Sequence, residues 1–279
     1  MFPKNLKPWF FVALSLTGLF IGLATFEGTK ADEVKKADPL SSLQKTRAEQ
    51  LTNLFENGSF DFAYGFVKSL GDGRGITAGR AGFTTATGDL LKVVKDYTAQ
   101  KPDNVLAEFI PRLWEIFRER SDREEGLEGL SQAWKTASKD PDFRRVQDEV
   151  VDELYYQPSV QYSNQLGLRT ALARAAVYDT IIQHGGGDDP DGLPAILERT
   201  QQTLGGTPVS GIDEKLWLDT FLSQRRETLA HAHDESTREV WSKSVGRCDV
   251  FRSLAEQGNY NLSGVITVNA GGFNDVLRE

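Results

Sequence analysis

The segment "SLGDGRGITAGRAGFTTATGD", residues 69–89, contains six glycines, two aspartates, two arginines and five hydroxyl-bearing residues. Glycine tolerates positive φ and allows another chain to approach the backbone, so this density predicts tight turns. Three kinds of structure fit: a phosphate-binding loop, a turn in a sheet, or the floor of a cleft. The first is excluded, because "GDGRG" lacks the spacing of a dinucleotide fingerprint and no Gly-Lys-Ser/Thr step follows. The polar residues Asp72, Arg74, Thr77 and Asp89 therefore belong to a bulged sheet turn or to a cleft.

The chain on either side of this segment is mainly helical. Residues 39–57 place leucines at helical spacing, and the following Gly58 is typical of a helix end. Residues 60–66 alternate aromatic and smaller side chains, which predicts a strand, and we expect Thr87 to cap the next helix. Every longer segment downstream has helical periodicity except a possible strand at 265–268. One small β element in a helical chain predicts the α+β class, mainly α.

The first residues differ from the rest of the chain. Residues 1–31 have a basic start, a long apolar run and small residues at the end, which predicts a cleaved secretory signal. The alternative is an uncleaved, outward-facing membrane anchor over residues 9–26, which is at the short limit for a spanning helix. A charged tether at 32–39 then leads into a folded domain at 40–279. The protein is accordingly predicted to be secreted.

Charge and cysteine content narrow the possible partners. The formal net charge is −8, and loss of residues 1–31 removes three lysines and one glutamate, which gives −10. Such an acidic chain disfavours nucleic acid and favours cationic ligands, although acidic residues also commonly form a solvated face. A single cysteine, Cys248, excludes an internal disulfide, and the remaining chain is long enough to fold without one.

Two carboxylates, Glu56 and Asp72, differ in their expected surroundings. Glu56 ends an apolar helix beside Leu54 and Phe55, whereas Asp72 lies in a glycine-rich, solvated turn. Glycosidic cleavage needs this difference, because one carboxyl protonates the leaving oxygen while the other stays ionised. The structural alternative is a helix-end glutamate and an aspartate in an Asx-turn, which any acidic protein can contain. On these residues alone both interpretations stay open.

The order of several motifs along the chain gives additional information about function. "AEQLTNLFENGSFDF" ends a helix with a glutamate, and "GDGRGITAGRAGFTTATGDLL" follows with a Gly-Asp-Gly-Arg-Gly-x-Thr step and a Thr-Gly-Asp step. Together with "VYDTIIQHGGGDDP", "WLDTFLSQRRETLA" and "HDESTREV", this order resembles the bacterial chitosanases of glycoside hydrolase family 46. The resemblance covers about residues 45–255. It implies a lysozyme-like fold, two mainly helical lobes with a small sheet and a cleft between them, with 40–279 as the catalytic domain.

The resemblance implies endo-cleavage of β-1,4-linked glucosamine in chitosan with inversion. It makes Glu56 the general acid, Asp72 the base that activates water, and Thr77 the residue whose hydroxyl helps to hold that water. Arg74 and Asp89 are implied to line the sugar-binding cleft. Because Asp89 begins a helix, we expect the helix dipole to keep it ionised.

Other roles follow from the later motifs. The resemblance implies further cleft positions for Tyr156, His184 and Asp234. It implies a buried charge network that supports the acid, formed by Asp179, Arg225 and Arg238. An arginine beside an acid favours the ionised form, whereas a general acid must hold its proton, and Asp179 would offset that charge. Two features depart from the family: His-Gly-Pro is replaced by His184-Gly185-Gly186, and an acidic residue before Asp234 has only Glu227 as a candidate.

The expected partner is chitosan, a cationic polysaccharide, with neither nucleic acid nor a stable protein partner, and the chain is expected to be a monomer. No metal or organic cofactor is implied, because an acid–base pair needs only water; His231 and His233 would point to different faces of a helix. Two other functions are considered: a peptidoglycan muramidase and a non-catalytic polysaccharide-binding protein. Carboxylates in the cleft disfavour the anionic wall polymer, and a binding module has no need of Glu56, Asp72 and Thr77 together.

Overall fold

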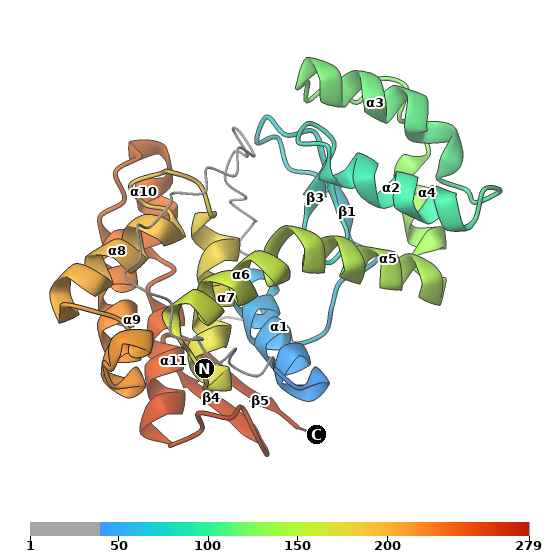
Figure 1. Ribbon diagram of the computed structural model, residues 1–279. Helices are drawn as coiled ribbons and strands as arrows, with labels where there is room; N and C mark the ends of the chain where they lie inside the picture. Colours follow the sequence, from blue (N-terminus) through green and yellow to red (C-terminus); the bar gives the residue numbers. More distant parts are fainter. Residues whose placement is uncertain (1–39, 279) are drawn as a thin grey trace, which may run out of the picture. The chain divides into compact units, whose positions relative to one another are not determined.

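The fold is described from a computed structural model (Figure 1). The structure describes residues 40–278, apart from the side chain of Ser236. The predicted signal segment 1–31, the alternative anchor 9–26 and the tether 32–39 lie outside the described residues. Within the described part of the chain, no helix combines the length and the apolar character needed to cross a membrane.

The chain divides into two compact units. Unit 1 combines the described chain up to Phe60 with Gln157 and the described residues after it, and unit 2 is Asp61–Tyr156. Both units are mainly helical and each contains one small antiparallel sheet, which confirms the predicted mainly α, α+β class. The cleft expected between two lobes stays a prediction.

Unit 1 is built around helix α7, Ala171–His184, which is buried along almost its whole length. A helix with no solvated face must be covered on all sides. Helices α1, α6, α8, α9 and α11 all contact it. The helices around α7 are α1 Ser42–Asn57, α6 Gln157–Leu166, α8 Leu193–Leu204, α9 Glu214–Ala230, α10 Glu235–Ser242 and α11 Gly246–Glu256, with a 3₁₀ turn at Pro208–Ser210. Figure 1 shows the last strands, β4 and β5, beside α11.

The ends of α1 confirm the sequence-based boundaries. Ser41 is the N-cap, and its hydroxyl accepts from the N–H of Gln44 while the Gln44 side chain accepts from the N–H of Ser41. This reciprocal arrangement is a capping box. At the other end Gly58 adopts a φ of 69°, a left-handed conformation that glycine tolerates, and its N–H bonds to the carbonyl of Leu54. Glu56 is therefore held in the last turn of α1.

The possible strand at 265–268 is one half of a hairpin. Strand β4, Ile266–Ala270, pairs antiparallel with β5, Phe273–Leu277, and Ile266 lies opposite Leu277. Burial alternates along β4, with Ile266 and Val268 inward. Two glycines, Gly271 and Gly272, form the turn and both have positive φ.

Unit 2 contains a three-stranded antiparallel sheet, which follows α1 in the sequence. The strands are β1 Val67–Ser69, β2 Ile76–Ala78 and β3 Phe83–Thr84, with β2 in the middle. The helices are α2 Asp89–Gln100, α3 Ile110–Glu119, α4 Leu130–Ala137 and α5 Pro141–Val151, with a 3₁₀ turn at Ala107–Phe109 and a π-helix at Asp152–Tyr156. The core joins Phe83 of the sheet to Leu90, Trp134 and Phe143 of the helices. The glycine-rich segment 69–89 thus forms a sheet with tight turns.

Two local predictions for unit 2 are wrong. Residues 60–66 form no strand, and two of their rings pack on a cation instead: Arg80 lies 4.0 Å from the ring centre of Phe62 and 5.9 Å from that of Tyr64. The carbonyl of Tyr64 accepts from the Trp134 indole at 2.9 Å, so it needs no strand partner. Thr87 does not cap α2. The N-cap is Gly88, and the Thr87 hydroxyl bonds to the Asp89 carboxylate.

Candidate active site

Glu56 is held by an arginine from a distant part of the sequence. Its Oε1 accepts a short hydrogen bond from Nη2 of Arg247, at the start of α11. The Arg247 side chain is buried, whereas that of Glu56 keeps 16% of its exposure. The guanidinium also lies 5.4 Å from the ring centre of Phe55. Glu56 is thus a partly exposed carboxyl fixed from its buried side.

Arg247 also faces Asp179 of α7. Its Nη2 is 3.8 Å from Oδ1 of Asp179, and Nη1 bonds to the Gln183 side chain. Burial opposes the charged form of the guanidinium, but the charges of Asp179 and Glu56 outweigh it and raise the pKa of Arg247. Arg247 therefore stays a cation shared by two carboxylates.

The second arginine of the network is Arg225 of α9. Its Nη2 lies 2.7 Å from Oδ2 of Asp179, and both side chains are fully buried. The two groups are not aligned for a hydrogen bond, so their attraction is mainly Coulombic. Asp179 and Arg225 are thus buried next to each other, and their role in supporting the acid stays a prediction.

The prediction for Arg238 is wrong. Its side chain is 48% exposed and bonds to the carbonyls of Ala232 and His233. Arg247 takes the expected place instead. The sequence does contain a signal for it: Arg247 shares a helix face with Phe251 and Leu254, both of which are buried, so a charge on that face needs a buried partner.

In unit 2, Asp72 lies between Gly71 and Gly73, both of which have positive φ. Its Oδ1 accepts from the backbone N–H of Arg74 at 3.1 Å, and its Oδ2 accepts from Nε at 3.1 Å and Nη2 at 2.5 Å. Arg74 is thus an ion-pair partner of Asp72. Gly75 has a φ of 73°, and a Cβ there would overlap the hydroxyl of Thr85. The carboxylate side chain stays 30% exposed.

Thr77 lies in the middle strand of the sheet. It pairs with Lys68 of β1 and Thr84 of β3 and is fully buried. Within residues 40–278 its hydroxyl has no hydrogen-bond partner. A buried hydroxyl without a protein partner has the capacity to bind a water molecule, and the hydroxyls of Thr52 and Ser163 share this property.

Asp89 begins α2 beside the same sheet. Its Oδ1 accepts from the N–H of Thr84 at 2.7 Å, the hydroxyl of Thr87 at 2.6 Å and the N–H of Leu90 at 2.9 Å. Burial nevertheless raises the pKa of Asp89, and these hydrogen bonds oppose the rise only in part. The expectation that the helix dipole keeps this group ionised is therefore incomplete, because desolvation is the larger effect.

The remaining predicted cleft residues have different surroundings. Tyr156 is buried at the end of the π-helix, and Asp234 is exposed just before α10. His184 is 1% exposed; its Nδ1 is 2.9 Å from the carbonyl of Asp191, and its ring packs on Trp241. Burial holds the pKa of His184 well below its usual range. A neutral Nε2 can then accept from Nε of Arg225 at 3.5 Å, so His184 supports the network from inside unit 1 and does not line a surface.

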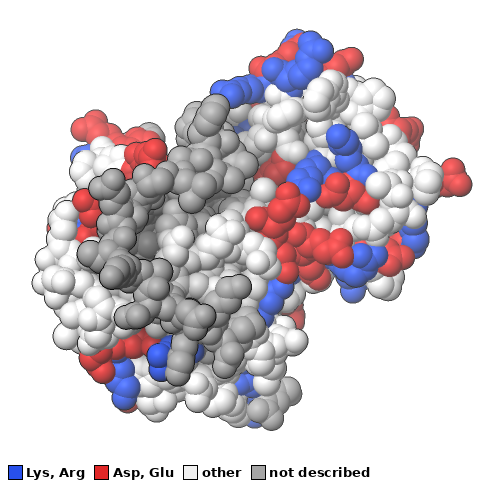
Figure 2. Space-filling view, viewed as in Figure 1, with Lys and Arg blue, Asp and Glu red and all other residues white. Residues whose placement is uncertain are grey.

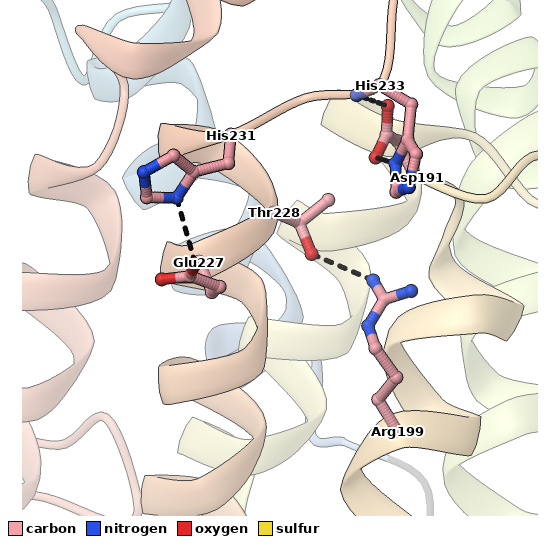
Figure 3. Close-up of a pocket in the computed structure, with 6 residues that line it drawn as sticks. All are labelled: Asp191, Arg199, Glu227, Thr228, His231 and His233. Atoms are coloured by element: carbon pink, nitrogen blue, oxygen red, sulfur yellow. Dashed lines mark hydrogen bonds and ion pairs between the residues drawn. The ribbon is translucent and has the colours of Figure 1, made fainter.

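A pocket of unit 1 is lined in part by His233, the residue before Asp234 (Figure 3). His233 binds the buried carboxylate of Asp191 twice, through its backbone N–H and through Nδ1, each at 2.7 Å. Glu227, the candidate for the missing acidic residue, is 73% exposed and pairs with His231 at 2.9 Å. Figure 3 shows the two histidines directed to separate carboxylates. Among residues 40–278 no group of three or more His, Cys, Asp or Glu side chains could hold a metal ion.

Several surface charges of unit 2 form ion pairs. On the face shown in Figure 2, acidic and basic side chains of unit 2 lie next to one another. Lys101 contacts Asp140 and Asp142, and Arg145 contacts Asp142 and Glu149. These ion pairs offset part of the negative charge of the unit.

Comparison with known proteins gives consistent matches. Residues 50–266 match glycosyl hydrolase family 46. A chitosanase from Bacillus subtilis is 52% identical over 231 residues, 83% of this chain and 83% of that protein. A solved mutant chitosanase of Bacillus subtilis, complexed with six glucosamine units, is 50% identical, covers 86% of this chain and 100% of its own, and has a TM-score of 0.77. A Gynuella sunshinyii chitosanase of the same family, complexed with chitotetraose, is 45% identical over 86% of this chain and 98% of its own, with a TM-score of 0.75. The shared fold confirms the predicted lysozyme-like class.

Proposed function

This chain belongs to glycosyl hydrolase family 46, and from that membership we propose that it is a chitosanase. It hydrolyses β-1,4 linkages between glucosamine units inside a chitosan chain, with inversion at the anomeric carbon. The observation that carries this conclusion is the 52% identity to a chitosanase over 83% of both chains. Glu56 occupies the helix-end position and Asp72 and Thr77 the Gly-Asp-Gly-Arg-Gly-x-Thr step that support this proposal.

Glu56 is the general acid in this proposal. It protonates the oxygen of the glycosidic bond as that bond breaks. The guanidinium of Arg247 holds this carboxyl in place and also faces Asp179, so Glu56 is fixed from its buried side while its exposed part can reach the leaving oxygen.

Asp72 is the base in this proposal. It accepts a proton from the water that attacks the anomeric carbon, while the guanidinium of Arg74 fixes the carboxylate through its Nε and Nη2. The hydroxyl of Thr77, which lacks a protein partner within residues 40–278, orients that water. Attack by water on the face opposite the leaving oxygen inverts the configuration in one step.

Recognition of the substrate falls to carboxylates that can bind the ammonium group of each glucosamine. Asp89 offers its Oδ2, because the hydrogen bonds within residues 40–278 all go to Oδ1. Asp234 is exposed at the start of α10 and serves as a second site. We assign Tyr156 a supporting contact with the sugar. The protein acts as a secreted monomer on chitosan and does not bind nucleic acid.

Two substitutions test the assignment of the acid and the base. Glu56→Gln and Asp72→Asn keep the size of each side chain but remove its proton chemistry. We expect each to reduce kcat for soluble chitosan by at least about 10³-fold, since each group is essential to an acid–base step. Release of reducing ends measures turnover, and circular dichroism checks the fold.

The matched control is Glu198→Gln, which alters an exposed glutamate on α8. It should keep full activity. Substantial turnover by either site variant would contradict the assignment. Lysis of cell walls in the absence of chitosan cleavage would favour a muramidase, and saturable binding of chitosan without products would favour a non-catalytic protein.

A further inference from the structure

The hairpin β4–β5 contacts the neighbours of both members of the Glu56–Arg247 pair. It follows α11 in the chain, and the family match ends at residue 266, where the hairpin begins. Both strands contact each other along their whole length, and β4 packs on α11. The hairpin carries none of the residues assigned to the chemistry.

The first contact is made by the turn. Gly271 lies directly against Gly246, the first residue of α11 and the residue before Arg247. A Cβ on Gly271 would overlap the carbonyl oxygen of Gly246, and a Cβ on Gly246 would overlap that of Gly271. Backbone touches backbone here, so the turn fixes where α11 begins.

The second contact is made by the first residue of β5. The ring of Phe273 lies 5.1 Å from that of Phe55, the residue before Glu56. Phe55 in turn packs against Phe251 of α11 at 5.8 Å and lies under the guanidinium of Arg247 at 5.4 Å. One aromatic group thus joins the end of α1, the start of the final helix and the hairpin.

We propose that the hairpin β4–β5 is a positioning element for the general acid. It holds α11 through Gly271 and α1 through Phe273, and so sets the geometry of the Glu56–Arg247 ion pair. The inference rests on the proposed role of Glu56 as the acid. Gly246, Gly271 and Phe273 are positioning residues in this proposal, and none of them contacts the substrate. Displacing a catalytic group by about 1 Å can cost about 10²-fold in rate, so small shifts in this packing should be measurable.

The two turn glycines provide a matched test. Gly271 has a φ of 60° and Gly272 a φ of 90°, so alanine is strained at either position. Only at Gly271 does the added methyl collide, because nothing lies within 4 Å of a Cβ on Gly272. We expect Gly271→Ala to lower kcat on chitosan by about tenfold or more with KM within about twofold of the parent. Gly272→Ala should leave both constants close to those of the parent.

A second series keeps the test independent of the turn. Phe273→Ala removes the ring that supports Phe55 and should lower kcat in the same way, while Phe273→Leu should restore most of it. Val276→Ala on the same strand, where the valine is 46% exposed, is the control and should be neutral. Thermal unfolding of each variant confirms that the measured enzyme is folded.

The outcomes distinguish failure of the hairpin's positioning role from failure of the proposed function. If Glu56→Gln is inactive while Gly271→Ala and Gly272→Ala have equal kcat, the hairpin has no positioning role and the function stands. A rise in KM without loss of kcat would also overturn the inference, because a displaced acid should act on the chemical step. If Glu56→Gln retains activity, the proposed role of the acid fails first.

Discussion

At the scale of single residues, Asp89 combines two opposing influences. Three donors stabilise its carboxylate through Oδ1, but burial is the larger effect and raises the pKa of Asp89. The group therefore takes up a proton at a higher pH than an exposed aspartate does. Since only the ionised form attracts an ammonium group, binding of glucosamine should weaken as the pH falls through this raised pKa.

This gives a prediction for KM. In the parent enzyme KM for glucosamine oligomers should be low above the pKa of Asp89 and should rise below it. Asp89→Asn should have a KM higher by about tenfold, in line with the loss of a charge-assisted hydrogen bond, and a weaker dependence of KM on pH. Steady-state kinetics over the acidic range measures both. Equal pH dependence in the two enzymes would show that Asp89 does not bind the amine.

A second prediction at this scale concerns Arg247. Arg247→Ala removes the cation that Glu56 shares with Asp179, while Asp179 keeps Arg225, so we expect a cost in the free energy of unfolding at or below the value of about 3–5 kcal/mol that breaking a fully buried pair brings. We also expect a large fall in kcat. Chemical denaturation and kinetics measure the two effects. Arg238→Ala is the control and should cost under about 1 kcal/mol, because that side chain is half exposed. A larger cost for Arg238→Ala than for Arg247→Ala would contradict this and would favour Arg238 as the network member, as the sequence suggested.

These two arginines also show what the sequence could predict at the site. The acid and base stand in short motifs, so their identities follow from local sequence. The partner of Glu56 lies 191 residues away, and nothing in the residues next to Glu56 selects Arg247 over Arg238. The apolar face that Arg247 shares with Phe251 and Leu254 marks it for burial, but only the packing of α11 on α7 and α1 brings it to Glu56.

At the scale of secondary-structure elements, Asp191 and His233 connect two loops. Asp191 precedes α8, and His233 follows α9 and immediately precedes Asp234 (Figure 3). The Asp191 carboxylate is almost fully buried, and both of its oxygens accept from His233. The connection thus orients the short turn that carries Asp234.

We expect loosening of this connection to affect binding more than chemistry. His233→Ala should raise KM for chitosan several-fold with little change in kcat, and His233→Asn, which keeps a donor near the position of Nδ1, should restore KM in part. His231→Ala is the control, since its ring pairs with Glu227 and not with Asp191. Initial rates at varied substrate concentration decide this. Equal KM for the two alanine variants would mean that the connection does not orient Asp234.

The elements themselves were predictable to different degrees. Helix α1 ends as its leucine spacing and Gly58 predict, because capping is local chemistry. The alternation at 60–66 was misleading, because the ring of Phe62 packs on Arg80 and the carbonyl of Tyr64 accepts from Trp134, and no neighbouring strand pairs with this segment. Alternation predicts a strand only when a partner strand lies beside it, and that is a tertiary fact.

At the scale of the whole molecule, the mainly helical class and the family were predictable because both depend on patterns distributed over most of the chain. The buried network was not, since it joins residues 56, 179, 225 and 247 from four helices. The net charge of −8 favours a cationic substrate but does not locate its binding site, because some acidic side chains of unit 2 form ion pairs with basic ones. The account as a whole therefore depends on the acid–base pair.

The configuration of the first product tests that pair most directly. Proton NMR during hydrolysis of a glucosamine hexamer resolves the anomeric hydrogens of newly formed reducing ends before they mutarotate. A single displacement by water, with Glu56 as acid and Asp72 as base, predicts that the α-anomer appears first. Initial formation of the β-anomer would require a covalent intermediate and would contradict the assignment of Asp72 as a base acting on water.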